Sequence, residues 1–357
     1  MTVIVKLAFE RKKLQILLIL AALGQGLHDR SQALTNPELK RLADALPFVL
    51  RSSLAESTNK KYERGWMGWK SWASTKDGVT VCPGDPFFVC LYLTALTFSN
   101  GTKGALSDAF YGIRWGHHLA GYISPTDNAT VQMAFEGAQR ICAKPVRKKD
   151  PMVAEMVRAI IDSFGTGDPT LHDFRFLIVV TICYAGFLRI EELLATKLGC
   201  IKLKQTHLEI FLEECKNDQH REGNKVIIAR TGTRYCPVGI VEKFLKRAGL
   251  DLKTDSSAHL IPRLISTKRG LKAHRTLGIG YTRAREVFKD YVSPLEREGY
   301  NLGLHSMRAG GATMASENNV EGDLIDIHGR WKSGKSKAIY IRHSLNKRLS
   351  VSQSLGL

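Results

Sequence analysis

The sequence of 357 residues has no CxxC pair, and its seven cysteines are scattered and odd in number. This spacing argues against a disulfide framework and against a cysteine zinc site. The simplest interpretation is that the thiols stay reduced in an intracellular protein. Cys183 and Cys200 stand among apolar neighbours, so we expect both to be buried.

A membrane span is also missing, because a bilayer needs roughly 20 apolar residues in a row and the run Leu14–Leu23 has about half of that. Basic residues 11–13 precede this run, so the segment is similar to a secretory signal, and the sequons at Asn100 and Asn128 would then matter. We favour an accessory helix or wrongly included upstream sequence. Residues 1–45 remain an unassigned N-terminal extension.

Acidic residues are few, with 34 Asp and Glu against 52 Lys and Arg, which gives a formal net charge of +18. Such an excess favours a polyanionic partner, and nucleic acid is the commonest one. An acidic membrane surface and plain solubility are the alternatives on charge alone. The 44% of hydrophobic residues and the length are typical of a soluble globular protein with two domains.

Residues 46–143 indicate a small helical domain. Apolar residues recur at helical spacing in four stretches, which are Thr58–Ser74, Pro86–Ser99, Lys103–Gly121 and Asn128–Cys142. The first stretch carries an aromatic stripe that we interpret as core packing, made of Tyr62, Trp66, Trp69 and Trp72. The adjacent His117 and His118 would point in different directions on a helix, so a structural role is favoured over metal binding.

Residues 144–151 form a basic linker with two prolines, which is the best domain boundary in the chain. A basic connector suits contact with a phosphate backbone, although a solvated linker explains it equally well. Residues 152–357 then form a second, mixed domain with a C-terminal tail.

The second domain should combine helices with a small antiparallel sheet. Its expected helices are Met152–Phe164, Phe174–Thr196, Gly239–Arg247, Gly280–Val292 and one beginning at His305. Its expected strands are Cys200–Lys204, His207–Glu213 and Lys225–Arg230, with a polar hairpin turn over Glu214–Asn224. The fold class is therefore mainly α with a small antiparallel β-sheet.

Two basic residues in this domain need explanation. Arg189 stands within an apolar helix, and a half-buried arginine needs a partner. Glu192, three residues on, lies on the same helix face and can supply it, so a purely structural pair is one interpretation. Lys216 begins the polar hairpin, a position at which a lone lysine signifies little.

Two further motifs lie near the C-terminus. In HSMRAGG, His305 and Arg308 share a helix face, and the glycines permit close backbone approach. In HGRWKS, Trp331 stands nine residues before Tyr340. Residues 329–336 also match the GxxxxGK[ST] phosphate loop, but only 21 residues follow, too few for a nucleotide-binding domain.

Together these motifs resemble the tyrosine recombinase, or phage integrase, family. That family is marked by an Arg, a strand-turn Lys, His-x-x-Arg, a His or Trp, and a C-terminal Tyr. The matching residues here, in the same order, are Arg189, Lys216, His305, Arg308, Trp331 and Tyr340. The resemblance covers about residues 52–345, and the wording HSMRAGGATMA and GRWKS is also similar to recombinases carried by eukaryotic mobile elements.

The resemblance implies a DNA strand transferase that cuts and rejoins duplex DNA through a 3′-phosphotyrosine bond, without metal, ATP or other cofactor. Residues 46–143 would be its core-binding, DNA-binding domain and residues 152–357 its catalytic domain. Four protomers on two DNA sites would be the working assembly, with the tail beyond Ser344 docked on a neighbour. The protein would work inside the cell where its DNA lies, which is the nucleus in a eukaryotic host.

The resemblance also implies roles for single residues. Two forked guanidiniums, Arg189 and Arg308, would hold the phosphoryl oxygens, and Tyr340 would be the nucleophile. His305 would be the acid/base partner and Lys216 the acid for the departing oxygen. Two further side chains would support these groups, namely Glu192, which positions the arginines, and Trp331, which orients the phosphate. His328 is a fallback for the Trp331 role.

Two alternatives stay open beside this interpretation. A non-enzymatic relative could keep the fold and bind DNA without cutting it. A type IB topoisomerase uses similar groups and relaxes supercoils without exchanging strands between sites. Covalent trapping on a nicked duplex distinguishes an enzyme from a non-enzymatic relative. Strand exchange between sites distinguishes a recombinase from a topoisomerase.

Overall fold

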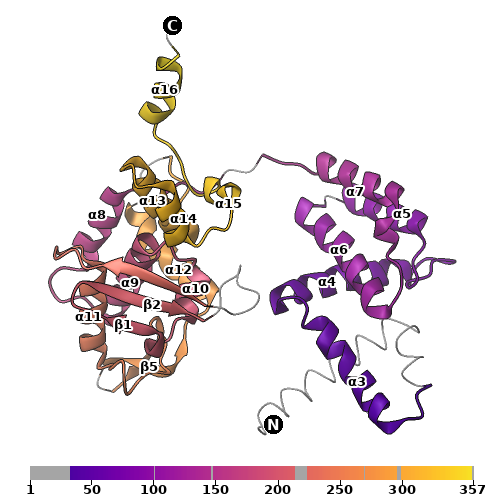
Figure 1. Ribbon diagram of the computed structural model, residues 1–357, viewed down its shortest axis with the longest axis horizontal. Coiled ribbons are helices and arrows are strands. Elements are labelled where there is room, and N and C mark those ends of the chain that lie inside the picture. The colour runs from indigo at the N-terminus through magenta and orange to yellow at the C-terminus, as the bar shows by residue number, and fades with distance from the viewer. Residues whose placement is uncertain are drawn as a thin grey trace. The chain divides into compact units, whose positions relative to one another are not determined.

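The computed structural model describes residues 33–99, 101–145, 148–213, 223–268, 270–295 and 299–355 (Figure 1). The chain divides into two compact units, residues 1–146 and residues 147–357, and this division falls within the basic residues 144–151. The apolar run Leu14–Leu23, Asn100 and Lys216 lie outside the described residues. Among the helices of the described ranges, none is both long and apolar enough to cross a membrane.

The first unit is helical throughout its described part. Its elements are α3 (Pro37–Arg51), α4 (Glu56–Ala73), α5 (Pro86–Phe98), α6 (Lys103–Ala120), η1 (Pro125–Asp127) and α7 (Ala129–Ile141). Four of the α-helices begin at polar caps whose side chains accept backbone N–H groups, namely Asn36, Asp85, Thr102 and Asn128. The helices expected from the apolar spacing are thus confirmed, while α3 was not predicted.

The core of this unit lies between α4 and α6. Trp66 and Trp69 are buried there, as the core interpretation of the aromatic stripe predicts. Gly112 and Gly116 let the two helices approach closely, because a Cβ at Gly116 would overlap the Trp66 ring. His117 is buried, donates to the Ile113 carbonyl over 2.8 Å and accepts the Gly84 N–H over 2.8 Å, which is a structural role.

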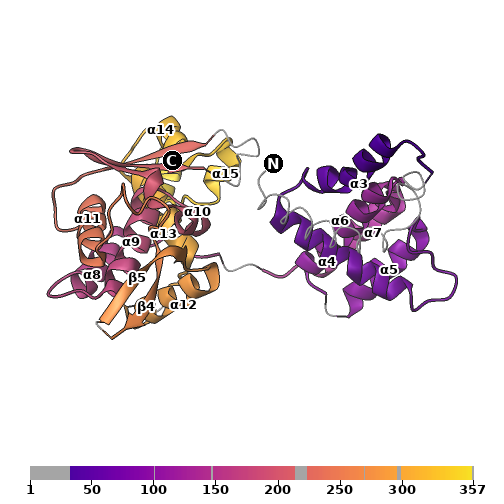
Figure 2. The same ribbon diagram turned by 90° about the horizontal axis from the view of Figure 1, so that it is seen from below.

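The second unit is built around one buried helix. Its helices are α8 (Ala154–Phe164), α9 (Leu171–Ala185), α10 (Ile190–Ala195), α11 (Pro237–Ala248), α12 (Tyr281–Val292), α13 (Leu304–Glu317), α14 (Gly322–Gly329), α15 (Gly334–Ala338) and α16 (Leu345–Gln353), with short turns η2 (Leu198–Cys200) and η3 (Ser293–Leu295). Helix α9 is apolar on nearly every face and is packed against α8, α11 and α13 (Figure 2). A helix that is apolar all round must be enclosed on all sides.

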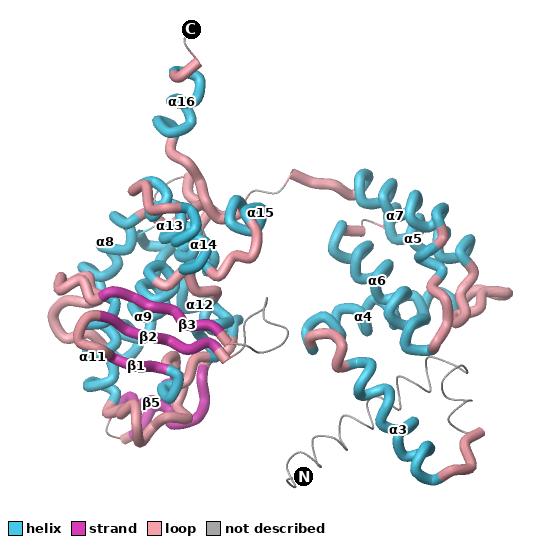
Figure 3. Tube along the Cα trace, viewed as in Figure 1, coloured by secondary structure: helices cyan, strands magenta, loops and turns pink. Residues whose placement is uncertain are grey.

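Two small antiparallel sheets complete the unit (Figure 3). The first contains β1 (Ile201–Leu203), β2 (His207–Leu212) and β3 (Asn224–Ala229), and pairs Leu208 with Ile228. The predicted strands are confirmed to within about a residue at each end. The second sheet, β4 (Pro262–Thr267) and β5 (Gly270–Gly278), was not predicted, because most of its side chains are exposed and leave no apolar alternation.

Two expectations were wrong in detail. The single helix expected over Phe174–Thr196 is broken, since α9 ends at Ala185, Phe187 has a left-handed backbone with φ 46°, and α10 begins at Ile190. Arg189 therefore lies at the N-terminal cap of α10 and not inside a helix. Cys183 is buried as expected, but Cys200 is only half-buried at the end of η2.

Candidate active site

The carboxylate of Glu192 organises the basic residues of the second unit. Its Oε1 lies 2.6 Å from Nη1 of Arg189, and its Oε2 accepts the backbone N–H of Arg189 over 2.9 Å. The predicted pair is therefore present, formed across the first turn of α10. Burial raises the pKa of the Glu192 carboxyl, but the fields of Arg330, Arg189 and Arg308 and the bonded N–H lower it further, so the pKa lies below its usual value.

Arg308 enters this group from α13 and is completely buried. Its Nη2 donates to the Gly329 carbonyl over 2.7 Å, its Nη1 donates to the Phe187 carbonyl, and it lies 3.9 Å from Oε2 of Glu192. Gly311 permits this approach, since a Cβ there would overlap the Tyr184 carbonyl oxygen. Burial, followed by the fields of the neighbouring arginines, lowers the pKa of Arg308 to about 10, so it stays charged at neutral pH.

The two aromatic side chains near the C-terminus close over Arg308. The guanidinium carbon of Arg308 lies 4.8 Å from the ring centre of Trp331 and 4.9 Å from that of Tyr340. The two rings are 5.5 Å apart, as expected for Trp331 packed beside Tyr340. The indole Nε1 of Trp331 is buried and has no hydrogen-bond partner among the described residues. A buried N–H group without a protein acceptor is available to donate a hydrogen bond to a ligand.

Tyr340 is placed by the turn that follows α15. Ser333 caps α15 by accepting the Ser336 N–H, and the Tyr340 N–H donates to the Lys337 carbonyl over 2.9 Å. Burial lowers the pKa of Arg189, but the field and hydrogen bond of Glu192 and those of Tyr340 outweigh it and raise the pKa. The side chains of Arg189, Arg308 and Tyr340 therefore converge.

A third arginine joins the group, and its role was not predictable from the sequence. Arg330 donates to Glu192 Oε2 over 3.0 Å and to the carbonyls of Gly186 and Phe187 over 3.2 and 3.0 Å. Its position beside Trp331 in HGRWKS was visible, but its partners lie some 140 residues away. Only the tertiary structure reveals that pairing.

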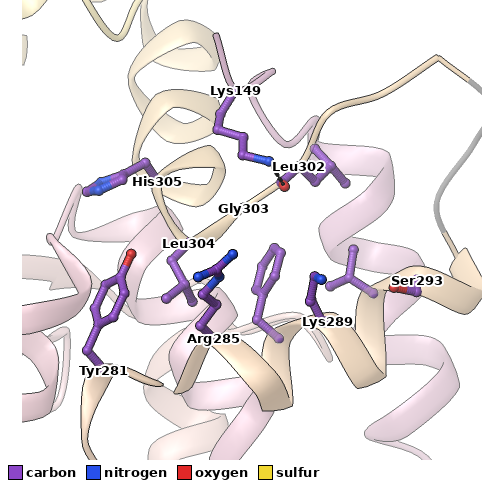
Figure 4. Close-up of a pocket in the computed structure, with 11 residues that line it drawn as sticks. Lys149, Tyr281, Arg285, Lys289, Ser293, Leu302, Gly303, Leu304 and His305 are labelled. Carbon is purple, nitrogen blue, oxygen red and sulfur yellow. Dashed lines mark hydrogen bonds between the residues drawn. The ribbon is translucent and has the colours of Figure 1, made fainter. Parts of the chain in front are cut away.

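His305 lies elsewhere on α13. Its side chain is exposed and lines a pocket of about 270 Å³, which Figure 4 shows. Within the described ranges no hydrogen bond, ion pair or ring contact joins it to Arg189, Arg308 or Tyr340. Lys216 cannot be placed, and the hairpin turn over Glu214–Asn224 likewise lies mostly outside the described residues.

The pocket beside His305 is strongly basic. Lys149, Arg285 and Lys289 line it, and none of its lining residues is acidic. Lys149 is held by the Asn301 side chain over 2.6 Å and by the Leu302 carbonyl over 2.8 Å, whereas Arg285 rises from α12 toward residues 302–304 (Figure 4). Such a pocket attracts an anion.

The structure also shows where His328 and the loop at residues 329–336 lie. His328 donates its Nε2–H to the Ala185 carbonyl over 2.8 Å and packs against Phe187, so it holds the turn after α9. The phosphate-loop alternative at residues 329–336 is wrong, because that loop must follow a strand and Gly329 instead ends α14. In the described part of the chain no group of three or more His, Cys, Asp or Glu is arranged to hold a metal ion.

Comparison with known proteins gives a consistent result. No family model matches the chain. It is 23% identical over 335 residues to an integrase/recombinase xerD homolog of Selenomonas ruminantium, covering 92% of this chain and 94% of that one. XerH site-specific recombinase, solved in a post-cleavage complex with difH substrate, superposes with a TM-score of 0.55 at 14% identity over 94% of this chain and 95% of that one.

A third similarity is to the Tn1549 transposon integrase, solved with transposon right end DNA, with a TM-score of 0.51 and 11% identity over 85% of this chain and 95% of that one. These solved structures share the fold of this chain. The sequence similarity to the xerD homolog extends over nearly the whole length of both chains, so the chain is similar to tyrosine recombinases in sequence and in fold.

Proposed function

We propose that this protein is a site-specific DNA recombinase that cuts and rejoins duplex DNA through a covalent 3′-phosphotyrosine bond at Tyr340. The observation that carries the proposal is the convergence of Arg189 and Arg308 with the Tyr340 phenol. Negative charge develops on the phosphoryl oxygens during attack, and fixed guanidiniums stabilise it. A nucleophile placed against such a clamp is arranged for attack on phosphorus.

The step would proceed as follows. The Tyr340 oxygen bonds to phosphorus while the bond to the 5′ oxygen breaks, and the phenol proton passes to His305. Lys216 protonates the departing 5′ oxygen. Attack by a 5′ hydroxyl reverses the step, and the phosphodiester energy is conserved in the covalent bond.

The role of Trp331 in this step is to orient the phosphate. Its buried indole N–H lacks a described partner and can donate one hydrogen bond to a phosphoryl oxygen. Glu192 holds Arg189 from behind. His305 is exposed one helical turn before Arg308, and hydrogen bonds to a reacting group often form only with substrate present.

We further propose that duplex DNA passes over the basic pocket beside His305. Lys149, Arg285 and Lys289 would contact phosphates that flank the one being cut. The relatives XerH and the Tn1549 integrase were solved with DNA. Residues 46–143, which lie within the first unit, would be the core-binding domain, and the enzyme would work in the compartment that holds its DNA, the nucleus in a eukaryotic host.

Four protomers on two DNA sites are the proposed working assembly. Helix α16 supports it, because four apolar side chains of the tail are exposed, namely Leu345, Leu349, Val351 and Leu355. Docking of this face on a neighbouring protomer would cover them. Truncation before Ser344 should abolish cooperative assembly and leave single-site binding intact, measured by gel shift, and unchanged assembly would contradict this.

The decisive experiment for the activity traps the covalent intermediate. Intact protein should form a denaturation-resistant adduct on a nicked suicide duplex, whereas Tyr340→Phe should form none and bind the duplex within about twofold as tightly. Equal behaviour of the two proteins would leave only a DNA-binding relative. Relaxation of supercoils without exchange between sites would instead indicate a topoisomerase.

A further inference from the structure

Arg330 occupies a backbone position that glycine would occupy more easily. Its φ of 56° and ψ of 42° are left-handed. It ends α14 in a turn where the Arg330 N–H donates to the Ile327 carbonyl over 3.1 Å and the Trp331 N–H donates to the Asp326 carbonyl over 3.0 Å. Glycine is the usual residue at this point of such a turn. A strained residue retained there suggests that its side chain is needed.

The side chain of Arg330 is buried and its four Nη hydrogens all have acceptors. Nη1 donates to the carbonyls of Gly186 and His328, and Nη2 donates to the Phe187 carbonyl and to Glu192 Oε2. Those donors are therefore turned toward protein and not toward a bound phosphate. This distinguishes Arg330 from a third arm of the phosphate clamp.

The groups that Arg330 holds are the ones that place Arg189. Residues 186 and 187 form the turn between α9 and Arg189, and Glu192 binds the Arg189 guanidinium and backbone N–H. Oε2 of Glu192 is shared between that N–H and Arg330. Among the groups that lower the pKa of Glu192, Arg330 has the largest effect, so it also keeps the carboxylate ionised.

We propose that Arg330 is a positioning residue for strand cleavage, which fixes Glu192 and the turn at residues 186–187 so that Arg189 faces the Tyr340 phenol. The inference rests on the proposed recombinase activity. It assigns a function to a residue between the predicted His328 and Trp331 that sequence motifs left without one. Because Trp331 follows directly, the same turn also sets the indole against Arg308.

The test replaces Arg330 with glycine, which suits the left-handed backbone and removes only the side chain. In single-turnover cleavage of the suicide duplex, Arg330→Gly should be about 10- to 100-fold slower than intact protein, the range typical of loss of a supporting contact. Duplex affinity should stay within about twofold. The melting temperature should fall, because Glu192 and the carbonyls of Gly186 and Phe187 lose a buried partner, so cleavage is measured where circular dichroism shows the variant to be fully folded. Millimolar guanidinium should restore part of the rate, and Arg330→Lys, which lacks the planar fork, should stay slow.

Asn319→Gly is the matched control. Asn319 has a φ of 58° in an equivalent turn after α13, and its side chain is exposed. In that turn the Asn319 N–H donates to the Ser316 carbonyl and the Val320 N–H donates to the Ala315 carbonyl. The Asn319→Gly variant should cleave at the wild-type rate, and added guanidinium should not change that rate.

Three outcomes would overturn the proposal. They are cleavage by Arg330→Gly within threefold of wild type, a fall in duplex affinity equal to the fall in rate, and a slow rate in the folded variant that guanidinium does not raise at all. The first would make the side chain dispensable, the second would make it a DNA ligand, and the third would make it a part of the fold and not a positioning residue. Failure of intact protein to form any adduct would instead reject the recombinase activity itself.

Discussion

The guanidinium carbon of Arg308 lies 4.9 Å from the centre of the Tyr340 ring, although Arg308 is on α13 and Tyr340 lies in the turn after α15. Arg308 is completely buried, and two backbone carbonyls and the Trp331 ring fix its plane. The phenol therefore lies against a cation that cannot swing away.

Arg308→Lys should nearly abolish cleavage, by at least ~100-fold, because an ammonium cannot supply a planar fork to an oxyanion. The Phe187 carbonyl would keep its bond from Arg330, but loss of the bond from Arg308 to the Gly329 carbonyl would cost about 1–3 kcal/mol of unfolding free energy. Suicide-substrate kinetics and urea denaturation measure the two effects. Arg158→Lys, at an exposed ion pair with Glu155, is the control and should change neither.

Trp331→Phe should slow cleavage by about tenfold and leave duplex affinity unchanged. Phenylalanine keeps an aromatic ring beside both Arg308 and Tyr340 but removes the indole N–H, which is a loss of one donor to the reacting phosphate. The same single-turnover assay provides the measurement. An unaltered rate would mean that Trp331 serves only to pack.

Glu192→Gln should destabilise the second unit near pH 7, by about 3–5 kcal/mol, because the buried side chains of Arg308 and Arg330 and the half-buried Arg189 lose their counter-charge. In the native protein the pKa of Glu192 lies below its ordinary value of 4.5, so its stabilising effect is complete above pH 4.5 and is lost as the pH falls through the lower, folded pKa. Denaturation at a series of pH values should show this loss in the native protein and not in the variant.

His117 should make the first unit sensitive to mild acid. Burial lowers the pKa of His117 below 6.5, the bond to the Ile113 carbonyl offsets part of this effect, and the charge of His118 adds to it. The Nε2 atom of His117 must also be unprotonated to accept the Gly84 N–H. The unfolded chain therefore binds the proton more readily, and stability should decline as the pH falls below 6.5. His117→Gln should flatten that decline, whereas His118→Gln should retain it.

The basic pocket should contribute to the salt dependence of DNA binding. Replacing both Arg285 and Lys289 with alanine removes two phosphate contacts, so the slope of log affinity against log salt should become shallower by about 1 to 2. Anisotropy titrations over a range of salt measure it. The exposed pair Lys243 and Lys246 on α11 provides the matched double-alanine control, and equal slopes for both variants would refute the contact.

Local structure was largely predictable from the sequence. The β1–β3 strands follow from short apolar runs between polar turns, and the helices of both units follow from their apolar spacing, because both patterns are encoded by neighbouring residues. The break after Ala185 was not predictable in this way. The apolar pattern of residues 174–196 is helical throughout. The left-handed backbone of Phe187 depends on distant residues, because Arg308 and Arg330 both donate to its carbonyl.

By itself the sequence determined the fold class, the basic charge and the order of the motif residues. The tertiary structure alone decided that Arg189, Arg308 and Tyr340 meet, that His305 faces a basic pocket instead, and that Arg330 joins Glu192. The physical reason is that spacing along a chain fixes only contacts within a turn or a strand. A buried guanidinium must satisfy its donors from whichever carbonyls and carboxylates the packing brings near, and for Arg308 and Arg330 several of these lie more than a hundred residues away.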